Sequence, residues 1–176
     1  MKSKKIKIVT ILLVIMTIGF SFTTLNTVTI KGSDTLVILS QKWAGTYMKT
    51  HPGVSIQVTG GDSGVGLAAL INGSTDIANS SRQINSAESE KIKEKYKKNA
   101  IEVPCAKDGL SIFLNKANKV SELTIEEIGN IYSGKITNWK EIGGDDAKIR
   151  LYGRERSSGT FEFIKEHVVK GDFSKH

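Results

Sequence analysis

The chain of 176 residues is poor in cysteine, proline and histidine, with one, two and three of these residues respectively. A single cysteine, Cys105, excludes an intrachain disulfide and a cysteine-based metal site, and we expect a small buried side chain there. With few prolines and 39% hydrophobic residues, the composition is that of a globular chain. Histidine, cysteine and carboxylate residues nowhere have the spacing of metal ligands, so we expect no metal or other cofactor.

Acidic residues are absent from residues 1–27, which contain four lysines among the seven net positive charges of the chain. The mild excess left elsewhere does not indicate a nucleic-acid partner. An apolar run over residues 8–22 follows the lysines, as in a secretory signal, and is shorter than the roughly 20 residues of a membrane span. A cleaved signal and an uncleaved membrane anchor both remain open for residues 1–26. Either places the rest of the chain outside the cytoplasm, secreted or attached to the outer face of the membrane.

Hydrophobic periodicity predicts alternating strands and helices, which is the pattern of an α/β fold with largely parallel pairing. Strands are predicted over residues 27–33, 54–61, 75–81, 101–116 and 148–155. Helices are predicted over residues 36–51, 63–73, 86–99, 124–134 and 158–169. A shift in composition near residues 104–110 divides the chain, after residue 26, into a first α/β lobe (27–104) and a second, partial lobe (105–176).

Four clusters of small polar residues follow predicted strands: "KGSDT" (31–35), "GGDSG" (60–64), "ANSSR" (78–82) and "RSSGT" (156–160). The carboxyl ends of strands line the ligand crevice of open α/β sheets, and helix N-termini favour anions. Helix capping alone explains any one cluster. Four of them, with Arg154 just before the last, indicate a shared anion site.

The segment "GDSG" (61–64) also resembles the surroundings of a protease nucleophile. That chemistry needs a histidine base beside the serine, and the only upstream histidine, His51, lies beside Pro52 in an apparent turn of an α/β chain. The second glycine of the hydrolase elbow Gly-x-Ser-x-Gly is also missing. We therefore interpret Asp62 and Ser63 as the opening of a helix and expect no enzymatic activity.

The segments "KGSDTLVILSQKWAGTY" (31–47), "GGDSGVG" (60–66), "TDIANSSR" (75–82) and "GRERSSGT" (153–160) together resemble the phosphate-binding proteins, the extracytoplasmic receptors of phosphate ABC transporters. The resemblance extends from about residue 28 to residue 170. It implies a periplasmic-binding-protein-like α/β fold of two lobes with mostly parallel sheets, which hold the anion between them. Family members continue for roughly another hundred residues, so the second lobe is expected to be incomplete.

Carried over by motif, the resemblance implies ten phosphate-binding residues. They are Ser33, Asp34, Thr35, Ser63, Ser80, Ser81, Arg154, Ser158, Gly159 and Thr160. The first three would contact phosphate through backbone N–H and hydroxyl groups, Arg154 would offer a charge-assisted contact, and residues 158–160 would wrap the anion at a helix N-terminus. We expect Arg82, Lys107 and Lys135 to be solvated surface charges.

The sequence departs from the family pattern at two positions, one that affects the selectivity for phosphate and one that affects the partner of Arg154. Ser81 stands where some members have an aspartate that accepts the proton of phosphate, and Asp34 is the remaining candidate for that role. Arg156 stands where a partner of the arginine is often found, and the neighbouring Glu155 could replace it, although a strand would direct it to the opposite side.

The resulting prediction is a receptor that binds inorganic phosphate and delivers it to the membrane subunits of an ABC transporter. Three alternatives remain: a receptor for another tetrahedral oxyanion, a membrane-anchored sensory or interaction module, and a remnant of the family that no longer binds an anion.

Overall fold

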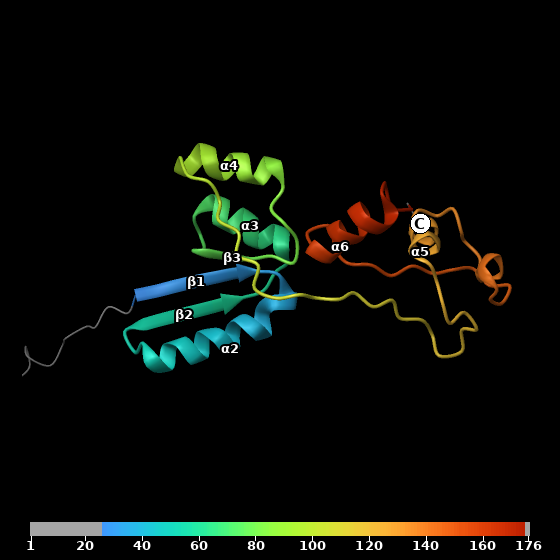
Figure 1. Cartoon of the computed structure of the whole chain (residues 1–176), viewed down its shortest axis with the longest axis horizontal. Helices are drawn as coiled ribbons and strands as arrows, with labels where there is room; N and C mark the ends of the chain where they lie inside the picture. The colour runs from blue at the N-terminus through green and yellow to red at the C-terminus, as the bar shows by residue number, and fades with distance from the viewer. Residues whose placement is uncertain (1–25, 175–176) are drawn as a thin grey trace, which may run out of the picture.

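The computed structural model describes residues 26–174. The expected signal or anchor at residues 1–26 thus lies almost entirely outside the described residues. Within residues 26–174, no helix is both long enough and apolar enough to cross a membrane. We keep the boundary expected from the sequence and call residues 26–104 the first lobe and residues 105–174 the second lobe (Figure 1).

The first lobe is built on a parallel three-stranded sheet with the order β2–β1–β3. Strand β1 (Asn26–Gly32) pairs along its length with β2 (Val54–Thr59), and its last three residues pair with β3 (Ile77–Asn79). β-Branched residues dominate β1 and alternate with polar ones in β2, as a sheet with covered faces requires. All three strands therefore end at the same edge, where their clusters of small polar residues begin.

Helices connect the strands of the first lobe and cover its sheet (Figure 1). α2 (Asp34–Thr50) joins β1 to β2, α3 (Ser63–Asn72) joins β2 to β3, and α4 (Ser86–Tyr96) follows. The core contains Ala44 of α2, Leu67 and Ala69 of α3, and Ile92 of α4. The sequence predicted each of these helices and strands, with ends that differ by a few residues.

Gly66 allows α3 to approach the sheet closely. A β-carbon on Gly66 would lie 2.5 Å from both the Cα atom of Gly32 and the carbonyl oxygen of Lys31. Only a residue without a side chain fits this contact. Gly66 thus brings the start of α3 against the carboxyl end of β1, where the candidate site lies.

The second lobe contains helices but no strand among its described residues. Its elements are α5 (Ile125–Tyr132), the 3₁₀-helix η1 (Trp139–Ile142), α6 (Gly159–Ile164) and the π-helix η2 (Lys165–Val169). The helices predicted at 124–134 and 158–169 are confirmed, whereas the strands predicted at 101–116 and 148–155 are wrong. The strand-like pairing found among the described residues of the second lobe is one isolated antiparallel bridge between Asn138 and Lys148. Both segments carry strand-like sequences, but a strand also needs a partner for its backbone.

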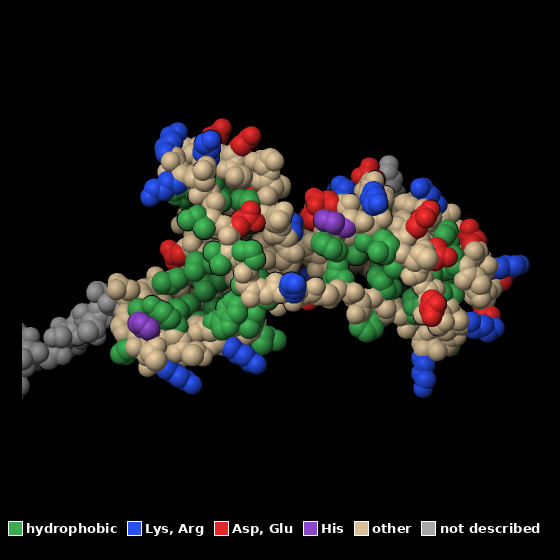
Figure 2. Space-filling view, in the orientation of Figure 1, with side chains coloured by type: hydrophobic (Ala, Val, Ile, Leu, Met, Phe, Trp, Pro, Cys, Tyr) green, Lys and Arg blue, Asp and Glu red, His purple; other side chains and the backbone are tan. Residues whose placement is uncertain are grey.

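The extended segment 101–116 exposes most of its apolar side chains. Ile101 and Phe113 are about nine-tenths exposed, and Cys105 is also exposed, so the prediction of a buried cysteine is wrong. An apolar groove of about 100 Å³ lies between residues 112–114, residues 149–152 and α5. Hydrophobic side chains reach the surface of the second lobe accordingly (Figure 2).

Candidate functional site

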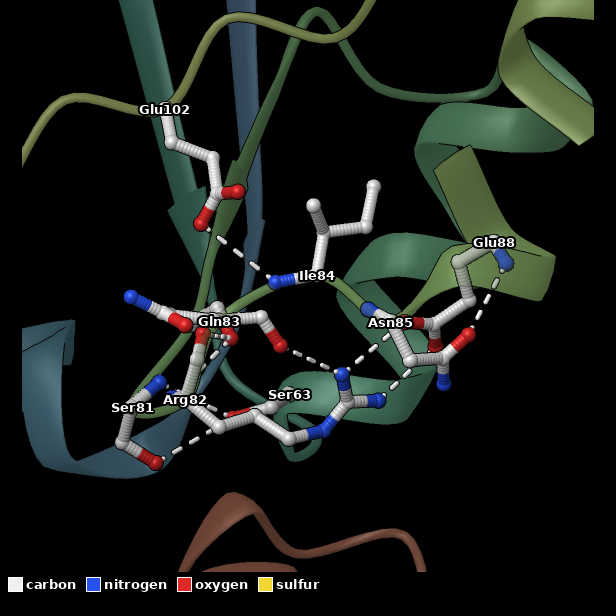
Figure 3. Close-up of polar contacts among 9 residues, drawn as sticks. Ser63, Ser81, Arg82, Gln83, Ile84, Asn85, Glu88 and Glu102 are labelled. Atoms are coloured by element: carbon white, nitrogen blue, oxygen red, sulfur yellow. Dashed lines mark hydrogen bonds and ion pairs between the residues drawn. The ribbon is translucent and has the colours of Figure 1, made fainter. Parts of the chain in front are cut away.

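The candidate site lies where β1, β2 and β3 end and α6 begins. The strands β1 and β2 point toward the start of α6 in Figure 1. Ser63 at the start of α3 is fully buried, and its Oγ atom accepts a hydrogen bond of 3.0 Å from the N–H group of Ser81. The two hydroxyl groups are 3.2 Å apart (Figure 3). A hydroxyl pair thus connects the helix after β2 with the loop after β3.

Gly159 brings α6 against this hydroxyl pair. A β-carbon on Gly159 would lie 2.5 Å from Ser63 Oγ and would also clash with Ser81 Oγ. Glycine is therefore required for the backbone of α6 to approach the first lobe so closely. Residues nearly 100 positions apart in the sequence meet here, as the shared-site prediction required.

Arg154 lies between two carboxylates of the first lobe. Its Nη2 atom is 2.8 Å from Asp62 Oδ1 and 3.4 Å from Asp34 Oδ2. Asp34 also accepts a hydrogen bond of 3.0 Å from the N–H group of Gly61, and Asp62 accepts one of 2.9 Å from Ser157 Oγ. The half-exposed guanidinium group is thus held at the edge of the site with its partners in the other lobe.

Backbone N–H groups at the starts of three helices also lie at this edge. Asp34 and Thr35 begin α2, Ser63 begins α3, and Gly159 and Thr160 begin α6. N–H groups in the first turn of a helix have no partner within that helix, and the helix dipole makes such a turn favourable for an anion. Three helices therefore start at the edge of the sheet where Arg154 and the buried hydroxyl groups lie.

Three of the expected residues already use a polar group in a hydrogen bond within the fold. Ser33 is buried, and its N–H group donates to the carbonyl oxygen of Asn79 at 2.9 Å, so that N–H group is not free for an anion. Ser80 Oγ donates to the carbonyl oxygen of Arg82 at 2.6 Å and thereby closes its own turn. Ser158 is buried at the start of α6, and its N–H group donates to the carbonyl oxygen of Glu155.

Arg82 is not the solvated surface charge that we expected. Its guanidinium group donates two hydrogen bonds, of 2.8 and 2.9 Å, to the two carboxylate oxygens of Glu88, with both side chains largely buried (Figure 3). Glu88 also belongs to the capping box of α4 with Asn85. The hydrogen bonds from Arg82 hold the pKa of Glu88 below its ordinary value. Arg82 thus anchors the loop of Ser80 and Ser81 to α4, whereas Lys107 and Lys135 are exposed as expected.

Sequence reasoning missed the contacts of Asp62 with Arg154 and Ser157. Asp62 was interpreted only as a residue that opens a helix, and Glu155 was considered as the partner of Arg154. In the structure Asp62 and Asp34 fill that role. One signal was available in the sequence: Asp34 and Asp62 both lie in clusters of small polar residues that follow strands. Their separation from Arg154, by 120 and 92 residues, concealed the ion pairs.

Comparison with known proteins places these features in a family. A family model described as a PBP superfamily domain matches residues 21–176, and the chain belongs to this family. The phosphate-binding protein PstS of Pseudomonas aeruginosa is 34% identical over 155 residues, which are 81% of this chain and 48% of the relative. The protein of the same name from Bacillus subtilis is 34% identical over 83% of this chain and 47% of its own length.

Solved structures resemble the chain in the same way. A protein of Clostridium perfringens, described as a phosphate ABC transporter substrate-binding protein with bound phosphate, is 34% identical with a TM-score of 0.71. The match covers 85% of this chain and 58% of that one. An ABC-type phosphate transport receptor of Vibrio cholerae gives 34% identity and a TM-score of 0.61, over 79% of this chain and 54% of its own. The α/β, periplasmic-binding-protein-like fold is confirmed, and the chain spans about half the length of the curated relatives it matches.

Proposed function

We propose that the protein binds inorganic phosphate reversibly as the extracytoplasmic receptor of a phosphate ABC transporter. The observation that carries the proposal is the convergence of three helix N-termini, the Ser63–Ser81 hydroxyl pair and Arg154 at one edge of the first lobe. The names of its relatives, which refer to phosphate binding and phosphate transport, support the same ligand.

The chemistry of the site suits a tetrahedral oxyanion held without a metal. Hydroxyl and backbone N–H groups donate to the oxygens, and the guanidinium group of Arg154 adds a charge-assisted hydrogen bond. Within residues 26–174, no group of three or more His, Cys, Asp or Glu side chains could hold a metal ion. Of the expected residues, we assign direct contacts to Asp34, Thr35, Ser81, Arg154, Gly159 and Thr160. Ser33, Ser63, Ser80 and Ser158 would shape the loops and helix starts around them.

The neighbours of Ser63 and Ser81 support reversible binding as the proposed activity. Ser63 contacts Ser81, and within residues 26–174 neither hydroxyl group is hydrogen-bonded to a histidine or carboxylate that could act as a general base. Delivery to the membrane subunits of an ABC transporter is part of the proposal, as is a location outside the cytoplasm, secreted or anchored to the outer face of the membrane.

Calorimetric titration of phosphate into the full chain, followed by titration of sulfate, tests the proposal. Arg154→Ala should weaken phosphate binding by about 2 kcal/mol, or roughly 30-fold, because a charge-assisted contact is lost. Arg150→Ala is the matched control, since it removes an exposed arginine four residues earlier. Equal effects of the two substitutions, or no phosphate binding by the folded chain, would reject the function.

The sulfate titration addresses selectivity. Sulfate carries no proton at neutral pH, so a carboxylate that accepts the phosphate proton would repel it. Binding of phosphate without sulfate would require an acceptor other than Ser81, and Asp34 is the carboxylate at the start of α2 that we would test next. Binding of both anions would indicate a receptor for tetrahedral oxyanions in general.

A further inference from the structure

Asp62 occupies the capping position of α3 but does not cap it. Its side chain makes no hydrogen bond to the first turn of that helix. Both carboxylate oxygens instead reach residues more than 90 positions away: Oδ1 accepts from Arg154 at 2.8 Å, and Oδ2 accepts from Ser157 at 2.9 Å. Only 14% of the side chain is exposed. The carboxylate therefore connects the first lobe to the loop that carries Arg154.

The backbone of Asp62 is strained. Its φ of 68° and ψ of 161° fall in a region that is populated almost only by glycine. A residue with a side chain persists in such a conformation when its surroundings determine it strongly, and such residues concentrate at functional sites. At Asp62 those surroundings are the two bonds of its carboxylate and the neighbouring bond from the N–H group of Gly64 to the carbonyl oxygen of Ser157, at 3.0 Å.

This arrangement orients the side chain of Arg154. Its side chain is long and about half exposed, so a free guanidinium group would lose much rotational freedom when it bound an anion. Asp62 accepts a hydrogen bond from the Nη2 atom of the guanidinium group, and its bond to Ser157 fixes the loop around that group. A group that is already oriented binds its ligand at a lower entropic cost.

We propose that Asp62 is a positioning residue that orients Arg154 and the loop 153–158 toward the anion, at the cost of local backbone strain. This inference rests on the proposed function and deepens it. It assigns to Asp62 a role that depends on the charge and geometry of its carboxylate, not on the opening of α3. Glycine at this position would relax the backbone and remove no cap bond, so stability and anion affinity should respond differently.

The first test is Asp62→Gly in the full chain. We expect the dissociation constant for phosphate to rise about tenfold, while the melting temperature does not fall, because relief of strain offsets the lost bonds. Lys97→Gly is the matched control. Lys97 caps the end of α4 in the left-handed region, with a φ of 54° and a ψ of 27°, so glycine relieves a positive-φ strain there without touching Arg154. Its affinity for phosphate should stay unchanged.

A double-substitution cycle separates positioning from general damage. If Asp62 acts through Arg154, then Asp62→Gly should have little further effect on phosphate affinity in a chain that already carries Arg154→Ala. Asp62→Asn keeps an oxygen acceptor and removes only the negative charge, so it should lose less affinity than Asp62→Gly. Additive effects, or an unchanged affinity in Asp62→Gly, would overturn the inference.

Amide hydrogen exchange without phosphate distinguishes this inference from the proposed function. The N–H group of Gly64 should exchange faster in Asp62→Gly than in the unsubstituted chain, because the loop that accepts its hydrogen bond is released. If the unsubstituted chain binds no phosphate, the proposed function fails, and this exchange rate alone decides whether Asp62 holds the loop. Unchanged exchange at Gly64 would overturn the inference.

Discussion

The two lobes of this chain differ in how the backbone of each is paired. The first lobe has a complete parallel ladder with helices joining its strands, whereas the described residues of the second lobe have one isolated bridge. Exposure is greatest where the backbone has no ladder: Phe113 in the extended segment of the second lobe is almost fully exposed, whereas Leu67 is buried against the sheet of the first lobe. The helices of the second lobe still bury Ile131. Stability should nevertheless concentrate in the first lobe.

Gly66→Ala should produce the largest change in the stability of the first lobe relative to the second. The added methyl group would meet backbone atoms of Gly32 and Lys31 at 2.5 Å, and overpacking against backbone should cost about 2–3 kcal/mol of unfolding free energy. Trp43 on α2 and Trp139 in η1 are the only tryptophans of the chain, so Trp139→Phe leaves a fluorescence signal for the first lobe and Trp43→Phe one for the second. In urea, the first-lobe transition should shift and the second-lobe transition should not.

Gly45→Ala is the matched control for that measurement. Gly45 also lies within a helix, but a β-carbon there would meet nothing within 4 Å. Alanine should stabilise α2 by about 0.5–1 kcal/mol through its higher helix propensity. Destabilisation by both substitutions would mean that the close approach at Gly66 is not the cause. A joint shift of the two tryptophan transitions would mean that the lobes unfold as one unit.

Local signals predicted the helices and strands of the first lobe well. Pro52 follows the end of α2, and the structure adds a capping box of Asn85 and Glu88 at the start of α4 that the sequence analysis did not use. These signals act between residues that are neighbours in the sequence. The failures at 101–116 and 148–155 have a different origin, because a strand is defined by its partner and these segments have no ladder in the structure. Cys105 was predicted wrongly for the same reason, since burial depends on what packs against the segment.

Motif placement predicted which residues of the candidate site meet, but not their partners. Ser63, Ser81 and Gly159 come together because parallel strands end at one edge of the sheet. The pairing of Arg154 with Asp62 depends instead on the three-dimensional path of two loops, and no local pattern encodes it. The ion pair of Arg82 with Glu88 was missed although only six residues separate them, because the loop brings Arg82 back over the start of α4.

Glu88→Gln should have an intermediate effect, confined to the first lobe. The substitution leaves the largely buried guanidinium group of Arg82 without its charged partner, which should cost about 1–2 kcal/mol at neutral pH. Because the native pKa of Glu88 is lowered by Arg82, the ion pair contributes stability above the ordinary pKa of 4.5 and loses it as the pH falls through the native value. The difference between Glu88→Gln and the unsubstituted chain should therefore shrink below pH 4.5.

Urea titrations at pH 7 and at several values below pH 4.5 measure this dependence with the first-lobe fluorescence signal. Glu90→Gln is a matched control, because Glu90 is an exposed residue of the same helix. A constant difference at all pH values would show that the negative charge of Glu88 does not stabilise the first lobe.

Phe113→Ser should have the smallest effect and addresses the second lobe directly. Phe113 borders the apolar groove, yet 90% of its surface is exposed, so its removal should change the unfolding free energy of the second lobe by less than about 0.5 kcal/mol. Ile131→Ala, in contrast, removes a buried side chain of α5 and should cost about 2 kcal/mol or more. If Phe113→Ser destabilised the lobe as much as Ile131→Ala, the segment 112–114 would be packed against the rest of the second lobe in solution. The two lobes would then differ less in how their apolar side chains are buried. Equal stability of Phe113→Ser and the unsubstituted chain would locate the stable part of the second lobe in its helices.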